Sequence, residues 1–378
     1  MRIIIAPNAF KGSLSADEAA ECIARGLKKS KLSCTLQLIP IADGGDGTAH
    51  LISKKLSAKP VKVLVHGPLD KKIEASYGWM SKSKTAIIEL ADASGLRLLN
   101  HSKLNPLNSN TRGTGELMKS ALDKGAKKIL LGIGGSATVD GATGLLNELG
   151  VKFLDKKGNK ITEFPQGLLT LDQVDMSSID RRLKDCQITL LCDVTNKLLG
   201  PNGAASVFGP QKGANENEVF LLEKCLHQLN KIVKKDLGIE MDSFEYGGSS
   251  GGVAAGLAAF VNAKLVSGIS YYFDIIGFEN ELKNTDLLIT AEGKFDSQTM
   301  DGKGPYGVAE KALQYKIPVI LLGGDVPLKI IDDLHHYFNV IMPIGHAPVS
   351  ITDAMKNTAV DLERTAMELG NLLALKND

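Results

Sequence analysis

Several features that mark common protein classes are scarce in this chain of 378 residues. Aromatic residues are few, Trp79 is the only tryptophan, and a formal net charge of +1 leaves no basic excess. A surface that binds nucleic acid needs stacking aromatic residues and a basic stripe, so that class is excluded. The longest apolar run, residues 252–261, has about half the length that crosses a membrane.

Disulfide and secretion signals are missing as well. The five cysteines are odd in number and form no C-x-x-C pair, which favours reduced thiols in a cytosolic protein. Only three branched aliphatic residues precede Pro7, too few for a signal peptide. We therefore expect a cytoplasmic protein whose partners are small molecules, with neither nucleic acid nor membrane among them. The sequence leaves open whether the protein forms a homo-oligomer.

The most informative stretch is residues 127–144, KKILLGIGGSATVDGATG. Its aliphatic start predicts a buried strand, Gly132, Gly134 and Gly135 predict a turn, and a helix is expected from about Gly144. Uncovered N–H groups at such a turn, and the positive end of a helix dipole, attract anions. The stretch predicts a phosphate or carboxylate site, although a tight turn that only needs positive φ angles would use the same glycines.

Strands and helices alternate at both ends of the chain, but not in its middle. Residues 2–6 and 35–41 predict strands around a helix that begins with a capping box at Ser15. Three more strands are expected from residue 286 onward, followed by a long closing helix over about 350–373. Residues 60–91 are rich in strands with little helix between them, which is typical of a mixed sheet.

The predicted fold class is therefore α/β with two domains. Residues 1–62 and 282–378 are expected to form a flavodoxin-like or Rossmann-like doubly wound domain with a parallel sheet, and residues 63–281 an inserted mixed-sheet α/β domain. Open α/β sheets bind ligands at the carboxyl ends of their strands. The polar loops of the two domains would then face each other across a cleft.

The loops that follow these strands carry groups suited to phosphoryl transfer. Lysines and backbone amides bind phosphates, carboxylates bind Mg²⁺, and one carboxylate can accept a hydroxyl proton. The candidates are Lys11, Lys212, Lys294 and Lys303, together with Asp43, Asp46, Asp193, Glu292 and Asp296. Any one of them could cap a turn or face solvent, but their recurrence after successive strands favours one shared site.

Other enzyme classes are excluded or weakened by their motifs. The chain has no Walker A sequence and no protein-kinase signature set, so neither class applies. Gly132, Gly134 and Ala137 do satisfy the relaxed dinucleotide fingerprint, with Asp155 near the position of a ribose-binding acid. An NAD-dependent hydroxy-acid dehydrogenase is thus an alternative, weakened because Asp155 enters a short turn. A non-catalytic binder of small acids is another.

Long motifs, in one order along nearly the whole chain, resemble the bacterial type I glycerate kinase family. They are APNAFKGSLSA (6–16), PIADGGDGT (40–48), TRGTGEL (111–117), GIGGSATVDG (132–141), DVTNKLLGPNGAASVFGPQKGA (193–214), the glycine-rich segment 247–256 and AEGKFDSQTMDGKGPYGVA (291–309). The resemblance implies phosphorylation of D-glycerate with ATP and Mg²⁺, at the 2-hydroxyl to give 2-phosphoglycerate. The 3-hydroxyl is the alternative. A flavodoxin-like domain around an inserted domain is implied too.

Within this resemblance each candidate residue has an expected role. Phosphates of ATP would be held by Lys11, Lys212 and the glycine-rich turns, namely Gly134, Gly135, Ser136, Gly251 and Gly252. Asp193 would orient or deprotonate the substrate hydroxyl, and forms the catalytic set with Lys11 and Asp296. Arg112 and Lys303 would clamp the glycerate carboxylate, Asp43 and Asp46 would bind its hydroxyls, and Glu292 and Asp296 would lie near the metal.

The chain also departs from the family's usual residues. Asn8 and Ala9 stand where Asp-Ser is common, and Val139 stands where Asn is usual. Lys294 replaces a usual Arg, which keeps the charge but loses the two-pronged fork that suits a carboxylate. We expect fine substrate discrimination, rather than the reaction itself, to be affected.

Overall fold

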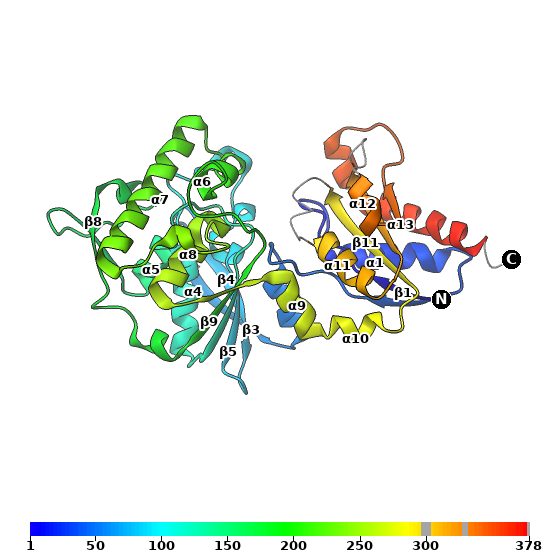
Figure 1. The fold of residues 1–378 in the computed structure, drawn as a ribbon, viewed down its shortest axis with the longest axis horizontal. Helices are drawn as coiled ribbons and strands as arrows, with labels where there is room; N and C mark the ends of the chain where they lie inside the picture. Colours follow the sequence, from blue (N-terminus) through cyan, green and yellow to red (C-terminus); the bar gives the residue numbers. More distant parts are fainter. Residues whose placement is uncertain (296–303, 327–331, 376–378) are drawn as a thin grey trace. The chain divides into compact units, whose positions relative to one another are not determined.

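The computed structural model describes residues 1–295, 304–326 and 332–375 (Figure 1). Its contacts divide the chain into two compact units. The first unit is Met1–Asp43 with Ile269–Asp378, and the second unit is Gly44–Gly268. Each unit contains parallel strands and helices. The chain is therefore an α/β protein, as its sequence predicts.

The sheet of the first unit is parallel throughout. Its strand order is β13-β12-β11-β1-β2, an order known among open parallel α/β sheets. β1 lies inside the sheet because its three isoleucines are buried on both faces. The strands are β1 (Arg2–Ile5), β2 (Thr35–Leu38), β11 (Leu287–Lys294), β12 (Val319–Asp325) and β13 (Val340–Pro343).

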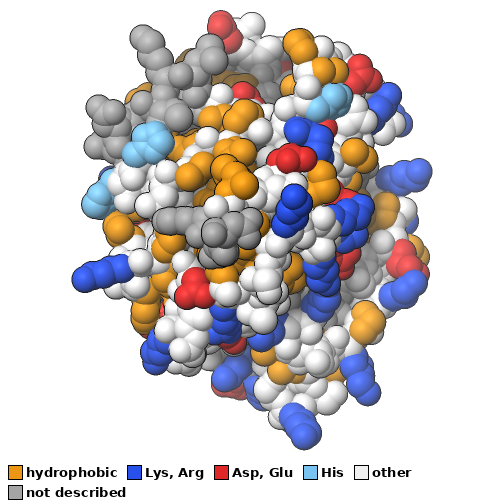
Figure 2. All heavy atoms as spheres, turned by 90° about the vertical axis from the view of Figure 1, so that its right-hand side faces the viewer, with side chains coloured by type: hydrophobic (Ala, Val, Ile, Leu, Met, Phe, Trp, Pro, Cys, Tyr) orange, Lys and Arg blue, Asp and Glu red, His pale blue; other side chains and the backbone are white. Residues whose placement is uncertain are grey.

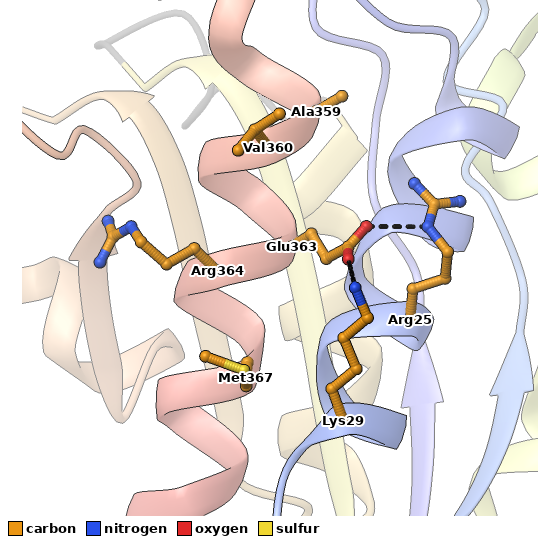
Figure 3. Close-up of a pocket in the computed structure, with 7 residues that line it drawn as sticks. All are labelled: Arg25, Lys29, Ala359, Val360, Glu363, Arg364 and Met367. Atoms are coloured by element: carbon orange, nitrogen blue, oxygen red, sulfur yellow. Dashed lines mark hydrogen bonds and ion pairs between the residues drawn. The ribbon is translucent and has the colours of Figure 1, made fainter.

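The helices of the first unit include the predicted helix after Ser15 and the predicted closing helix. Ser15 and Glu18 form the expected capping box at the start of α1, and Ser350 caps the closing helix α13. These helices pack against each other, and Glu363 of α13 binds Arg25 and Lys29 of α1 beside a pocket (Figure 3). The helices are α1 (Ala16–Lys29), α9 (Gly268–Ile276), α10 (Phe278–Leu282), α11 (Gly304–Gln314), α12 (Asp332–Tyr337) and α13 (Ile351–Ala374).

The main sheet of the second unit is mixed, as the sequence predicts for its strand-rich start. The strand order is β10-β9-β6-β5-β4-β3. The first four strands are parallel to one another, and β4 pairs antiparallel with both β5 and β3. Its strands are β3 (Lys59–His66), β4 (Lys72–Met80), β5 (Thr85–Glu89), β6 (Lys128–Gly132), β9 (Gln187–Cys192) and β10 (Lys264–Ser267). A separate antiparallel pair consists of β7 (Lys152–Asp155) and β8 (Leu171–Asp175).

Helices of the second unit enclose one large apolar core. They are α2 (Thr48–Lys55), α3 (Ala91–Ser94), α4 (Arg112–Asp123), α5 (Thr143–Glu148), α6 (Ala204–Phe208), α7 (Glu216–Leu237) and α8 (Ser249–Val261). A short 3-10 turn, Pro210–Lys212, lies between α6 and α7. The core includes the buried side chains of β5, β6 and β9, so the carboxyl ends of these three neighbouring strands are firmly placed.

The division between the units differs from the expected boundaries at 62/63 and 281/282. The second unit already begins at Gly44, because α2 packs on β4, β5 and β6 and buries Ala49 and Ile52. It ends at Gly268, because α9 belongs with the first unit, where the hydroxyl of Tyr272 donates to the carbonyl oxygen of Pro40 at 2.9 Å. Both boundaries depend on which sheet a helix covers.

In the part of the chain that the structure describes, no helix is both long enough and apolar enough to cross a membrane. The face drawn in Figure 2 shows apolar side chains interspersed with lysine, arginine and acidic side chains. Its composition is that of an ordinary protein surface.

Candidate functional site

The glycine turn, which we define as Gly132–Ser136, follows β6 directly. Gly135 has a φ of +71°, which a side chain would strain. A Cβ on Gly134 would lie 2.3 Å from the backbone of Gly45, so the loop before α2 covers the turn closely. The glycines therefore serve both a positive φ angle and a close approach of backbone.

The helix dipole expected at this turn acts elsewhere. α5 begins only at Thr143, well after Ser136. Its amino-terminal end is already occupied by the buried carboxylate of Asp140, which accepts from the backbone N–H of Gly144 at 3.1 Å and of Thr111 at 2.9 Å. An anion at the glycine turn would depend on the turn's own N–H groups, not on a helix end.

Lys212 supplies a positive charge at the same turn. Its ammonium is buried and donates to Ser136 Oγ at 2.8 Å and to the carbonyl oxygen of Thr138 at 2.7 Å. Burial lowers the pKa of Lys212 to about 7, against the opposing effect of Asp140 and Asp193. The charge of this lysine is held by neutral oxygens under the turn.

The second glycine-rich segment packs on the residues that follow the turn. Ser250, Gly251 and Gly252 all have positive φ angles, which interrupt the first turn of α8. A Cβ on Gly251 would lie 2.1 Å from the carbonyl oxygen of Thr138, and the carbonyl oxygen of Gly251 accepts from the N–H of Gly141 at 3.0 Å. The structure thus brings Gly251 and Gly252 to the region of the glycine turn, where both are buried by protein.

Two of the predicted acids lie in loops of the second unit that approach each other at Gly44, where a Cβ would lie 3.0 Å from the backbone N of Asp193. Asp193 follows β9 and is half-buried. Asp46 lies in the loop that covers the turn, and its Oδ1 forms an ion pair with Arg97 at 3.2 Å. Arg97 also binds Asp92, which contacts His50 at 3.2 Å. A carboxylate, a guanidinium and a second carboxylate therefore form one network next to the turn.

Arg112, predicted to clamp the glycerate carboxylate, has protein partners. Its Nε donates to Glu148 Oε1 at 2.8 Å, and its guanidinium lies 4.0 Å from Asp70. The side chain is 41% exposed. Arg112 is thus anchored at the start of α4, and part of its guanidinium stays accessible.

Three polar residues converge in the first unit at the carboxyl ends of adjacent strands. Asn8, after β1, donates from Nδ2 to Asp43 Oδ2 at 2.9 Å and to Glu292 Oε1 at 3.4 Å. Lys11 is exposed in the loop that follows. An aspartate at position 8 would place a third carboxylate between these two acids, whereas the amide of Asn8 binds both.

Two predicted residues, Asp296 and Lys303, lie outside the described residues. Within the described ranges, no cluster of three His, Cys, Asp or Glu side chains is arranged to hold a metal ion. Asp155, the ribose-binding acid of the dehydrogenase alternative, instead accepts from the N–H groups of Lys157 and Asn159 in its own turn, and β7 is not part of the main sheet. The NAD-dependent dehydrogenase alternative is therefore left without its proposed ribose-binding acid.

Sequence reasoning missed Glu89. This acid ends β5, is 1% exposed, and accepts from the N–H of Ala49 at 2.8 Å. Burial is the main cause of a pKa raised well above its usual value, with Asp46 as the next contribution. The signal was available: an acid at the end of an otherwise aliphatic strand.

Comparison with known proteins shows which family the chain matches. The model of the glycerate kinase family matches residues 3–374. A glycerate kinase from Bacillus subtilis (strain 168) is 40% identical over 375 residues, 99% of this chain and 98% of that protein. A glycerate 2-kinase from Escherichia coli (strain K12) is 39% identical over 379 residues, again 99% and 98% of the two chains.

A solved structure is similar over the full length. The crystal structure from Salmonella typhimurium LT2, described as a glycerate kinase 2, has a TM-score of 0.81 and 38% identity. The match covers 100% of this chain and 99% of that chain. The chain therefore belongs to the glycerate kinase family, a family of phosphotransferases with an alcohol acceptor.

Proposed function

We propose that this protein transfers the γ-phosphoryl group of ATP to the 2-hydroxyl of D-glycerate and releases 2-phosphoglycerate and ADP. The family match over nearly the whole chain supports a glycerate kinase. The name of the Escherichia coli relative, glycerate 2-kinase, supports the 2-position. Transfer to the 3-hydroxyl is the alternative outcome.

The observation that carries this proposal is the buried lysine under the glycine turn. Both hydrogen-bond acceptors of Lys212 are uncharged oxygens, those of Ser136 and Thr138. A buried cation with neutral partners favours an anionic ligand nearby. We assign that ligand to the ATP phosphates, held by the N–H groups of Gly134, Gly135 and Ser136, with Gly251 and Gly252 bracing the chain behind them.

The remaining residues complete the proposed reaction. Asp193 orients the substrate hydroxyl or takes its proton as the oxygen attacks the phosphorus, and Lys11 stabilises the transferred phosphoryl group. Arg112 and Lys303 bind the glycerate carboxylate, while Asp43 and Asp46 bind its hydroxyls. The exposed part of the Arg112 guanidinium supports its role.

Mg²⁺ is proposed to accompany ATP, with Glu292 and Asp296 as its protein ligands. The described residues fit this, because Asn8 gathers the carboxylates of Glu292 and Asp43 at adjacent strand ends. Mg²⁺ prefers carboxylate oxygens and, in ATP-dependent enzymes, needs only one or two of them beside the phosphates. When bound, the ion neutralises phosphate charge.

We also propose that the first unit is a doubly wound, flavodoxin-like domain. The parallel order β13-β12-β11-β1-β2 supports this assignment. So do α1, α11 and α13, each of which packs on strands of that sheet. Ligands of such domains bind at the carboxyl edge, where Asn8, Asp43 and Glu292 lie.

The function is tested by measuring ADP release from ATP and Mg²⁺ in the presence and in the absence of D-glycerate. Glycerate-dependent ADP release is expected. A parallel incubation with NAD and a hydroxy acid should give no change in cofactor absorbance. Absorbance change without ADP release would favour the dehydrogenase, and glycerate binding without either product would favour a non-catalytic binder.

A further inference from the structure

Glu89 lies where the glycine turn and the loop before α2 meet. It is the last residue of β5, which pairs with β6, the strand that leads into the turn. The register sets Glu89 opposite Gly132, and a Cβ on Gly132 would lie 3.1 Å from Glu89 Oε1. A 1% exposed carboxyl group is thus packed on the first residue of the glycine turn.

The two oxygens of Glu89 have different surroundings. Oε2 accepts from the N–H of Ala49 at 2.8 Å, in the first turn of α2. The N-cap of this helix, Gly47, has no side chain to make that bond, so Glu89 substitutes for a capping residue. Oε1 is buried and has no hydrogen-bond partner.

The helix that Glu89 caps begins directly after the loop Gly44–Gly47. This loop carries Asp46, a proposed substrate ligand. The loop is also pressed on the turn, where a Cβ on Gly135 would lie 2.9 Å from Asp46 Cβ. Arg97 binds Asp46 from the other side at 3.2 Å. Glu89 therefore holds the start of α2, directly after the loop, and Arg97 holds the side chain of Asp46.

Burial is the largest influence on the pKa of Glu89, and the charged groups around it add to the shift. Asp46 and Asp92 are of like charge and disfavour a second carboxylate, and the opposing effect of Arg97 is smaller. Together with burial they raise the pKa of Glu89 well above its usual range. The shift favours the neutral acid over the carboxylate, and the neutral acid can still accept from the N–H of Ala49 through Oε2.

We propose that Glu89 is a positioning residue for glycerate binding, which holds the loop bearing Asp46 on the phosphate-binding turn. This inference rests on the proposed function. Glu89 acts as a capping group of fixed length, through the bond from Ala49 to its Oε2, and proton transfer from it takes no part in the reaction. Its length matters more than its ionisation.

Two substitutions separate length from charge. Glu89→Gln keeps the length and the acceptor for Ala49 but removes the acid, whereas Glu89→Asp keeps an acid but is one methylene too short. Glu223 is a matched control in the same unit. Its Oε1 accepts from the N–H of Gly200 at 2.7 Å, its Oε2 has no partner, and burial raises its pKa.

The experiment measures kcat and KM for D-glycerate and for ATP between about pH 6 and 9. Glu89→Gln should stay within about twofold of wild type at every pH, because the neutral hydrogen bond is kept. Glu89→Asp should raise KM for D-glycerate about tenfold or more, since small misplacements of binding groups are costly. Glu223→Gln and Glu223→Asp should leave KM unchanged.

Three results would overturn the inference. Loss of activity in Glu89→Gln with retention in Glu89→Asp would make the residue an ionised catalytic acid or base. Normal KM in Glu89→Asp would make it dispensable for positioning. Equal rises in KM for the Glu89 and Glu223 variants would reduce the effect to general loss of structure. A wild-type protein that phosphorylates no glycerate would refute the proposed function itself, and this inference with it.

Discussion

Two buried ionisable side chains beside the glycine turn support the assignment of the site. Burial lowers the pKa of Lys212 and raises that of Glu89, so each is driven toward its neutral form. Such groups reduce stability, and perturbed pKa values cluster where proteins bind or transform ligands. The pattern separates these two residues from the many exposed lysines and acids of the chain.

Replacing Lys212 with methionine has a pH-dependent consequence for stability. The pKa of Lys212 falls from 10.5 to about 7 on folding, so between these values the unfolded chain holds a proton that the folded protein has lost. Below pH 7 the folded protein bears the whole free-energy cost of burying the charged ammonium, and this cost falls as the pH rises above 7. Relative to Lys212→Met, wild type should gain up to about 1.4 kcal/mol in unfolding free energy per pH unit above pH 7.

Urea unfolding at about pH 7.5, 8.5 and 9.5 measures this difference. The exposed Lys231 provides the control, and Lys231→Met should run parallel to wild type. Parallel curves for Lys212→Met would show that the ammonium of Lys212 keeps an ordinary pKa in the folded protein.

Asp193→Asn tests the proposed role of that carboxylate in turnover. The amide has the same size but cannot take the hydroxyl proton, so kcat should fall about 100-fold or more. Its melting temperature should stay near that of wild type, because the residue is only half-buried. The exposed Asp185, changed to Asn, should affect neither quantity. Near-normal turnover in Asp193→Asn would remove the residue from the catalytic set.

For the helices and strands, the sequence was sufficient to predict a helix start wherever residues next to that start determine it. The capping box predicted at Ser15 is confirmed at the start of α1, and the closing helix predicted over about 350–373 is α13, which begins after Ser350. The start of the second unit was not predictable in this way. The buried face of α2 shows that the helix packs on something, but only the folded chain shows that it covers β4, β5 and β6.

The packing of α1 on α13 predicts a strong effect of one added methyl group. A Cβ on Gly26 would lie 2.2 Å from the carbonyl oxygen of Glu363, a backbone atom that cannot rotate away. Helix propensity favours alanine over glycine by about 1 kcal/mol, yet overpacking of this kind costs about 1–3 kcal/mol or more. Gly26→Ala should therefore destabilise the protein.

Thermal and urea unfolding measure that change. Gly345→Ala is the control, because a Cβ there would have no atom within 4 Å, and its effect should stay within about 0.5 kcal/mol. A Gly26→Ala variant as stable as wild type would mean that α1 and α13 lie farther apart than the structure has them.

For the protein as a whole, the sequence pointed to candidate residues in loops that follow strands, such as Asp43 after β2 and Asp193 after β9, and the roles given to them remain proposals. It did not lead to Glu89, although an acid at the end of an aliphatic strand was a signal, because the partner Ala49 lies 40 residues earlier in the chain. Nor could it show that Arg112 is held by Glu148, or that Asp140 closes the end of α5. The contacts Glu89–Ala49 and Arg112–Glu148 join residues far apart in the chain, and spacing along the chain does not encode them.

The central claim is that the family's reaction takes place here on the 2-hydroxyl of D-glycerate. It is tested most directly by phosphorus NMR of the product that forms from D-glycerate, ATP and Mg²⁺, with proton coupling to identify the phosphorylated carbon. We predict the doublet of a phosphate on a CH group, as in 2-phosphoglycerate. The triplet of a phosphate on a CH₂ group, or no new phosphate ester at all, would contradict the claim.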